Sequence, residues 1–313
     1  MLNLMQLPFS SATSLPQAAL RTNKLLYEIG RGASNNLRFF WADACGNLFL
    51  MLLGDVVDIN NVYTRLLSCA KTWPFDNILA LSPQCRRGVC ALSETTSCRA
   101  FTKLTDDFRL WLRILERDGT ESAMCGNGSR AVACLLNGLG IDKQVFLNGQ
   151  RRLELITLPD GTYSVSMGCV KNSGPFPFAQ KEECSVRPTT NEMQLYLAMG
   201  EPHAVTLVSD VDEVDLEACG SRIVPWANCT VVTKLKDNVA AVRTYERGVN
   251  RETLSCGTGA VVAAQLLMDA NQLGSMHQRE SVFTIMMKGG KLRVVVTPGF
   301  GSFLQGPAQV WEI

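Results

Sequence analysis

The chain has 313 residues, of which 46% are hydrophobic and 19% are charged. This composition supplies enough apolar surface for a packed core and excludes a disordered chain, and the length favours two domains of moderate size. Because 30 Lys and Arg nearly cancel 29 Asp and Glu, no basic field is available for nucleic acid or for an anionic membrane, and a small, roughly neutral ligand is expected.

The N-terminal segment, residues 1–36, is expected to be an extension of the folded part. Its first 27 residues contain no acid and only two bases. Neither a charged start nor a long apolar region is present, so a helix beginning after Pro16 is favoured over an organellar targeting segment. No stretch in the chain holds the roughly 20 uncharged apolar residues that span a bilayer, so no membrane partner is expected.

Short β-branched and apolar runs alternate with turn signals from residue 39 to the end. Several are joined by Asp-Gly, Gly-Gly or Pro-Gly turns, which are typical of hairpins. The predicted strand segments are 39–54, 109–120, 151–168, 204–210, 229–235, 239–248, 281–299 and 308–313. Few helices are expected. The clearest two, at 130–140 and 260–274, are apolar nearly all round, which predicts buried helices.

The segment before each of these helices carries nearly the same sequence. SAMCGNGSRAVACLL at 122–136 returns as LSCGTGAVVAAQLL at 254–267, and Glu121 and Glu252 each stand four residues before the cysteine. This indicates an internal duplication. We expect an α+β fold of two pseudo-symmetric halves, each a mostly antiparallel sheet around a central hydrophobic helix. The expected halves are 37–168, to which a final strand at about 303–313 returns, and 169–302.

Each repeat places a cysteine and two glycines at the start of a helix. The glycines let the backbone approach a ligand closely, and the first N–H groups of a helix bind an anion such as a carboxylate. A helix N-terminus lowers the pKa of a thiol from ~8.5 into the range of about 3.5–7.5, so Cys125 and Cys256 are candidate bases near neutral pH. Two thiols on opposite faces of one carbon can remove and return an α-hydrogen. The repeat therefore predicts an amino-acid racemase or epimerase.

Other kinds of site are less well supported. None of the 12 cysteines has Cys-x-x-Cys spacing, and His203 and His277 are the only histidines. No metal site is therefore expected, and the thiols are expected to be reduced in a cytoplasmic protein. Neither repeat carries the P-loop or the dinucleotide-binding pattern. Two alternatives stay open: a hydrolase or transferase using one cysteine with His203, and a non-catalytic amino-acid-binding protein.

At these motifs the chain resembles the cofactor-independent diaminopimelate epimerases. DGTESAMCGNGSR, and YERG followed by ETLSCGTGA, look like the two catalytic-cysteine motifs of that family, and the resemblance covers most of the chain from about Phe39 onward. CGNLF, PFDN, MGEPH, WANCT and GPAQVWEI fall in the expected order. The resemblance implies the diaminopimelate-epimerase fold, an amino acid as ligand, no pyridoxal phosphate, no metal and, in many members, a homodimer.

The resemblance also implies roles for single residues. Cys125 and Cys256 would be the catalytic acid and base. The backbone N–H groups that would bind the α-carboxylate belong to Gly126, Asn127, Gly257 and Thr258. His203 and Glu246 would lie beside the thiols and help to place the amino group, with a structural role as the alternative for His203. The residues that would line the far end of the pocket are Asn47, Asn77, Asn228 and Arg247.

Departures from the family pattern bear on the substrate. Glu116, nine residues before Cys125, and Glu201, before Pro-His, stand where the pattern has asparagine. Asn77 replaces a usual glutamine, and ERGVNRET is one residue longer than usual. Carboxylates at the distal end of the pocket would repel a second carboxylate and attract a cation. Lysine, ornithine, arginine or histidine is therefore the expected substrate, with diaminopimelate as the alternative if either glutamate is turned away from the pocket or is already paired with Arg247.

Overall fold

The computed structural model describes residues 23, 26, 37–68, 73–85, 108–142, 144–147, 151–177, 193–270, 280–297 and 299–313. Most of the expected N-terminal extension, including most of the helix after Pro16, lies outside these residues, as does His277. Asn23 and Leu26 are described and are helical. The Leu26 side chain is buried, and Asn23 accepts a 2.7 Å hydrogen bond from the indole nitrogen of Trp41.

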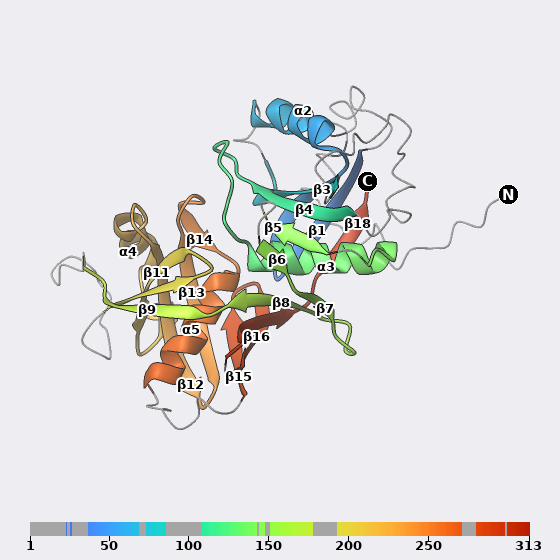
Figure 1. Ribbon diagram of the computed structural model, residues 1–313. Helices are drawn as coiled ribbons and strands as arrows, with labels where there is room; N and C mark the ends of the chain where they lie inside the picture. Colours follow the sequence, from blue (N-terminus) through green and yellow to red (C-terminus); the bar gives the residue numbers. More distant parts are fainter. Residues whose placement is uncertain are drawn as a thin grey trace.

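The first half of the molecule is built on a seven-stranded sheet in the order β18–β1–β2–β3–β4–β5–β6 (Figure 1). Its strands are β1 (Arg38–Ala44), β2 (Asn47–Leu53), β3 (Asn77–Cys85), β4 (Phe108–Leu115), β5 (Val145–Leu147), β6 (Arg151–Leu153) and β18 (Gln309–Glu312). Only the β2–β3 and β4–β5 pairs are parallel among these described strands. Because β18 pairs with β1, the end of the chain returns to the first half.

The second half is built on an eleven-stranded sheet in the order β7–β8–β17–β16–β15–β13–β12–β11–β10–β9, with β14 beside β13. Its strands are β7 (Leu155–Thr157), β8 (Tyr163–Gly168), β9 (Val170–Pro175), β10 (Gln194–Ala198), β11 (Glu201–Leu207), β12 (Asn228–Lys236), β13 (Val239–Glu246), β14 (Arg251–Thr253), β15 (Ser281–Met287), β16 (Gly290–Thr297) and β17 (Gly301–Gly306). Most pairs are antiparallel. The mixed architecture confirms the expected α+β class.

The chain changes from the first sheet to the second at Glu154, between β6 and β7. The sequence instead predicted a first half that extends to residue 168. The difference arises because β8 hydrogen-bonds with β17, more than a hundred residues further along the chain. An alternating pattern identifies a strand but does not identify its partner, so this boundary was not accessible from the pattern.

The α-helices whose bounds the structure gives are α2 (Val56–Leu67), α3 (Gly126–Leu139), α4 (Leu216–Ile223) and α5 (Gly257–Ala270). The two expected helices correspond to α3 and α5, which both begin directly after the repeated cysteine. The sequence analysis missed α2 and α4, which are amphipathic and are capped by the side chains of Asp55 and Asp215. None of the described helices is long and apolar enough to cross a membrane.

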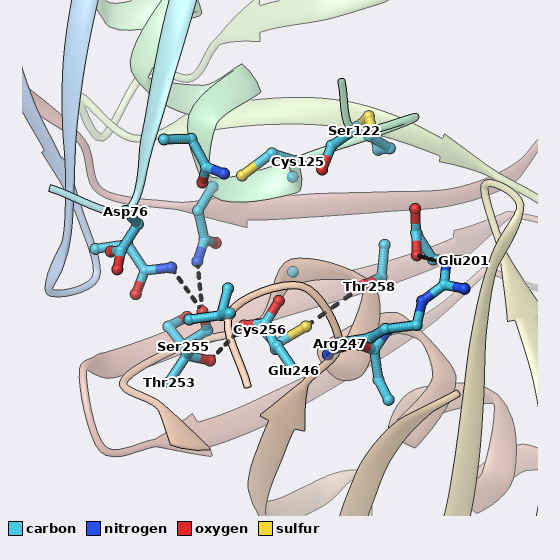
Figure 2. A pocket seen from close by; sticks show the side chains of 18 of the residues that line it. Asp76, Ser122, Cys125, Glu201, Glu246, Arg247, Thr253, Ser255, Cys256 and Thr258 are labelled. Carbon is cyan, nitrogen blue, oxygen red and sulfur yellow. Dashed lines mark hydrogen bonds and ion pairs between the residues drawn. The ribbon is translucent and has the colours of Figure 1, made fainter. Parts of the chain in front are cut away.

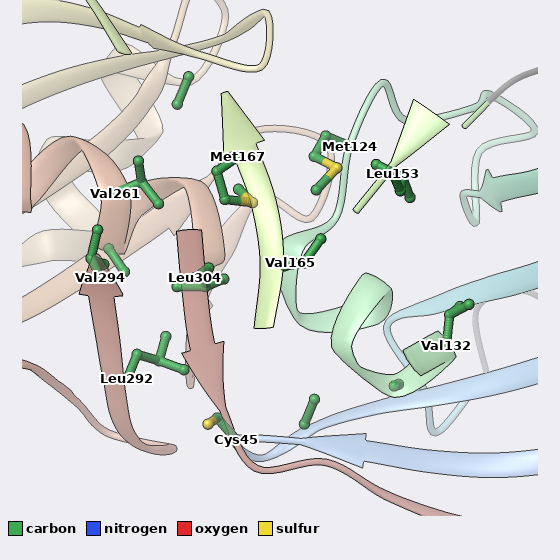
Figure 3. Packing of buried hydrophobic residues seen from close by; sticks show 14 of the residues in the cluster. Cys45, Met124, Val132, Leu153, Val165, Met167, Val261, Leu292, Val294 and Leu304 are labelled. Carbon is green, nitrogen blue, oxygen red and sulfur yellow. The ribbon is translucent and has the colours of Figure 1, made fainter. Parts of the chain in front are cut away.

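One apolar core joins the two halves. It includes buried side chains of α3 and α5 together with residues from both sheets. Figure 3 shows Val132 of α3, Val261 of α5 and Leu304 of β17 within it. Smaller clusters lie under α2 and under α4. Because α3 and α5 are surrounded by apolar side chains, their N-termini are held on a rigid base in the middle of the molecule.

A second contact between the halves involves two turns. Cys45 lies in the β1–β2 turn, and Gly289 lies in the β15–β16 turn. A Cβ atom placed on Gly289 would lie only 1.8 Å from the carbonyl oxygen of Cys45. The Gly289 N–H donates a 2.7 Å hydrogen bond to the carbonyl of Leu254. Only glycine fits between these backbone groups. The contact therefore holds the segment before Cys256 against the first half.

We expect Gly289→Ala to lower the free energy of unfolding by about 1–3 kcal/mol, because the new methyl group overlaps a backbone carbonyl that cannot rotate away. Chemical denaturation of the wild type and the variant measures this change. Lys291→Ala, at an exposed position of the same hairpin, is the control and should change stability by less than about 0.5 kcal/mol. Equal stabilities of wild type and Gly289→Ala would contradict the proposed contact.

Candidate active site

Each repeated cysteine caps the helix that follows it. The Cys125 Sγ accepts a hydrogen bond from the backbone N–H of Gly128 at 3.3 Å, and the Cys256 Sγ accepts one from Gly259 at 3.4 Å. The cysteine thus takes the position that Ser, Thr, Asp or Asn usually occupies at a helix start. The two thiols are therefore fixed in equivalent positions, one in each half.

The two helix N-termini lie against each other. A Cβ on Gly257 would be 3.0 Å from the Cα of Gly126, and a Cβ on either glycine would come within 2.8 Å of the Leu304 side chain. Any side chain at these two positions would force the helices apart. The glycine after each cysteine therefore permits the close approach of the two helix starts. It brings the segments 125–128 and 256–259, here called the two cradles, to one pocket.

Polar side chains of the first half form hydrogen bonds with the loop before Cys256. Asn47 and Asn127 both donate their side-chain N–H to the carbonyl of Ser255, at 2.9 and 3.0 Å (Figure 2). The guanidinium of Arg130, which is fully buried, donates to the Asn127 side-chain oxygen at 2.6 Å and to the Pro307 carbonyl at 2.8 Å. Arg130 thereby fixes which end of the Asn127 amide points to Ser255.

A cavity of about 70 Å³ lies between the cradles. Its walls include all but one of the residues expected at the site: Asn47, Asn77, Glu116, Cys125, Gly126, Asn127, Glu201, Asn228, Glu246, Arg247, Cys256, Gly257 and Thr258. The sequence analysis missed Asp76, Ser122, Met124, Val249, Thr253 and Ser255. Ser122 and Ser255 lie inside the repeated segments, and Asp76 directly precedes Asn77. Their closeness in sequence to predicted site residues could have indicated that they line the same cavity.

His203 is the exception, because it is not among the residues that line the cavity. It is fully buried behind the pocket wall, where its ring nitrogens lie 2.9 Å from the hydroxyls of Thr258 and Thr230. Burial lowers its pKa to about 3, so the ring is neutral. Thr258 separates it from Cys256. His203 therefore supports Thr258 from behind and does not contact the cavity.

The acidic residues of the repeat also lie away from the cavity lining. Glu121 pairs with Arg113 of β4 at 2.5 Å, and Glu252 pairs with Arg243 of β13 at 2.8 Å. Each acid thus joins the segment before the cysteine to a neighbouring strand in its own half. The repeated spacing reflects this structural role.

Burial dominates the protonation of both thiols. It raises the pKa of Cys125 to about 12, although the Gly128 N–H acts in the opposite direction. The pKa of Cys256 is also raised well above its ordinary value, first by burial and then by the charge of Glu246. The expectation of lowered thiol pKa values was therefore wrong in sign, because the loss of water around the thiolate outweighs the helix N-terminus.

Glu246 lies beside Cys256 at the end of β13. Its carboxyl group accepts hydrogen bonds from the Thr253 hydroxyl and from the Cys256 thiol. Burial is the largest influence on this group and raises its pKa to about 7. A carboxyl group with that pKa is half charged near neutral pH and responds to any cation placed beside it.

At the other end of the cavity, Glu116 is held by two neutral donors. Asn77 donates to one carboxyl oxygen at 2.6 Å, and the Ser122 hydroxyl donates to the other. Burial raises the pKa of Glu116. Glu201, in contrast, pairs with Arg247 at 3.2 Å, and Asp76 pairs with Arg251 at 2.7 Å. Glu116 and Glu201 therefore both face the cavity, but only Glu201 has a cationic partner there.

Solved structures share this fold at low sequence identity. A protein described as a predicted epimerase from Pseudomonas aeruginosa superposes with a TM-score of 0.61 at 15% identity, covering 88% of this chain and 99% of that one. A hydroxyproline epimerase from Agrobacterium vitis, with trans-4-hydroxy-L-proline bound, has a TM-score of 0.58 at 13% identity and covers 90% and 93% of the two chains. A Bacillus anthracis phenazine biosynthesis protein of the PhzF family has a TM-score of 0.57 at 14% identity, with coverage of 89% and 98%.

Curated relatives are closer in sequence. A diaminopimelate epimerase from Pseudomonas aeruginosa is 33% identical over 222 residues, which are 66% of this chain and 77% of the relative. One from Acinetobacter baylyi is 31% identical over 216 residues, 64% of this chain and 74% of the relative. No protein-family model matches the chain. The level and extent of identity to these relatives, together with the shared fold, show that the chain belongs to the diaminopimelate epimerase family.

Proposed function

We propose that the protein is a pyridoxal-phosphate-independent amino-acid racemase or epimerase that inverts the α-carbon by proton transfer between Cys125 and Cys256. The observation that carries this proposal is the pair of equivalent cysteines, each capping a buried helix whose N-terminus lies against the other. Inversion at carbon requires an acid or base on each face. A duplicated thiol cradle meets that requirement, whereas a single site does not.

The substrate carboxylate is proposed to bind at the two helix N-termini. Their first N–H groups have no partner within the helix and carry partial positive charge. Negative charge develops on this carboxylate as the α-hydrogen leaves, so donors fixed at that place stabilise the transition state. The loss of one such donor in other enzymes costs roughly 2.7–4 kcal/mol.

Substrate binding is proposed to activate the thiols that burial keeps protonated. The α-ammonium group brings a positive charge next to Cys256 and Glu246, and an adjacent opposite charge favours the anionic forms of these groups. The Cys256 thiol is hydrogen-bonded to the Glu246 carboxylate and passes its proton to it, which leaves a thiolate. One thiolate then takes the α-hydrogen as a proton and leaves its electron pair on the carbon. The opposite thiol gives a proton to the other face, and the two sulfurs have exchanged protonation states when the product leaves.

The substrate is proposed to be either a basic amino acid, namely lysine, ornithine, arginine or histidine, or diaminopimelate. The names of the curated relatives favour diaminopimelate. The acidic side chains of the distal cavity favour a basic amino acid. A hydrolase that pairs one cysteine with His203 has less support, because Thr258 stands between the two groups.

Replacing either Cys125 or Cys256 by Ala should lower racemisation of the substrate by about 10²- to 10⁴-fold or more, because each direction needs a base on one face and an acid on the other. Solvent-deuterium incorporation at the α-carbon, together with chiral analysis of the product, measures the loss. Cys169, whose side chain is exposed, is the control, and Cys169→Ala should retain full activity.

Wild-type protein should also stay active after treatment with hydroxylamine and dialysis, which remove pyridoxal phosphate. Full racemisation by Cys256→Ala, or activity that returns only with added pyridoxal phosphate, would overturn the two-thiol scheme.

Glu246 should make stability depend on pH. Its pKa is raised from 4.5 to about 7 in the folded protein, so the folded state holds this proton more tightly than the unfolded state does. The corresponding stability is fully present below pH 4.5 and is lost as pH rises through 7. The free energy of unfolding of the wild type should therefore fall more steeply over this window than that of Glu246→Gln.

Urea denaturation at a series of pH values tests this expectation. Glu213→Gln, at an exposed position, is the matched control and should keep the wild-type slope. Identical slopes for wild type and Glu246→Gln would show that Glu246 is not a buried, protonatable group.

A further inference from the structure

The charges around the cavity are unevenly compensated. The carboxylates that line it are Asp76, Glu116, Glu201 and Glu246, and the cation that lines it is Arg247. Asp76 and Glu201 have arginine partners at 2.7 and 3.2 Å. Glu116 and Glu246 form no ion pair with any residue that the structure describes. Two half-buried carboxyl groups, one near the thiols and one at the far end, are thus left to be matched by a ligand.

Glu116 is built to accept a ligand at a fixed position. Its two oxygens each accept one hydrogen bond, from Asn77 and from Ser122, and retain further acceptor capacity. Its backbone N–H is bound to the Thr120 carbonyl at 2.9 Å, which anchors the end of β4. The neighbouring Arg117 does not neutralise it by contact, because the Arg117 guanidinium donates to the carbonyls of Trp73 and Phe75.

We infer that Glu116 binds a cationic group at the distal end of the substrate, and that the substrate is an amino acid whose side chain ends in a cation and carries no second carboxylate. The inference rests on the proposed function, which sets the α-carboxylate at the helix N-termini and the α-ammonium group at Glu246. The distal end of the same molecule then meets Glu116. A buried carboxylate without a cation is unfavourable, so a cation there removes a cost as well as adding an attraction.

The ion pair of Arg247 with Glu201 disfavours a substrate that has a second carboxylate at its distal end. The Arg247 guanidinium is already paired with Glu201, the first residue of β11. In Figure 2 the Arg247 side chain reaches toward the Glu201 carboxyl group. The distal head of diaminopimelate carries an ammonium group that fits Glu116, but its carboxylate would share Arg247 with Glu201 and lie near two carboxylates. A side chain ending in an amine, guanidine or imidazole has no such conflict.

The test compares kcat/KM and α-deuterium incorporation for L-lysine, L-ornithine, L-arginine, L-histidine, LL-diaminopimelate and the neutral L-norleucine. The wild type should prefer at least one basic amino acid over both norleucine and diaminopimelate by about tenfold or more. Glu116→Gln should lower kcat/KM for that basic substrate by about 10- to 100-fold, the value of one charged hydrogen bond, and should lower kcat/KM for norleucine far less, because norleucine has no distal cation to lose.

Two further variants sharpen the result. Glu154→Gln removes an exposed carboxylate outside the cavity lining and should leave all substrates unchanged. Glu201→Gln releases Arg247 and should raise kcat/KM for diaminopimelate while affecting lysine less than Glu116→Gln does. Deuterium exchange of norleucine by Glu116→Gln shows that this variant is folded and has an intact thiol pair.

The outcomes separate the two proposals. A wild-type preference for diaminopimelate, or a Glu116→Gln variant that keeps its preference for the cation, would overturn the inference and leave the two-thiol function in place. A larger loss for lysine in Glu201→Gln than in Glu116→Gln would assign the cation to Glu201 and also overturn it. Absence of α-deuterium incorporation from every amino acid of the panel would overturn the proposed function and the inference together.

Discussion

The structure depends on the contact between the N-termini of α3 and α5. Their backbones lie so close together that a methyl group on Gly257 would be 3.0 Å from the Cα atom of Gly126. Helix starts carry partial positive charge and unpaired N–H groups, so two of them at this distance repel each other unless an anion lies between them. The apolar core around α3 and α5, with Leu304 against both glycines, holds them there despite that cost. Packing energy from the whole molecule thus maintains a site that is electrostatically prepared for a carboxylate.

The halves are joined by buried polar groups as well as by the core. Arg130 binds the carbonyl of Pro307, where the chain crosses back from β17 to β18, and it also orients Asn127 at the cradle. A Cβ on Gly306 would lie 2.4 Å from this guanidinium, so the crossing strand is shaped to fit it. The second repeat has Val261 in place of Arg130. The two cradles are therefore equivalent at the thiol but have different supporting contacts. Arg130 supports the cradle of Cys125, and the His203–Thr258 hydrogen bond supports the cradle of Cys256.

Membership of the diaminopimelate epimerase family accounts for the part of the pocket near the thiols. The distal part differs in a physically simple way, since a carboxyl group held by two neutral donors faces the cavity while the arginine opposite is already paired. The same burial that raises the pKa of both cysteines also raises that of Glu116 and Glu246. The pKa values of all four groups would therefore shift in the same direction if a cation were placed beside them.

The sequence by itself determined the duplicated cradles, the two buried helices and about two thirds of the cavity wall, because these features are local or are carried by short sequence motifs. Tertiary structure decided the rest. The pairing of β8 with β17 moved the boundary between the halves, and a position behind Thr258 removed His203 from the pocket. Burial reversed the expected direction of the thiol pKa values. Strand partners, desolvation and ion pairing depend on which distant residues are brought together, and no local pattern encodes that information.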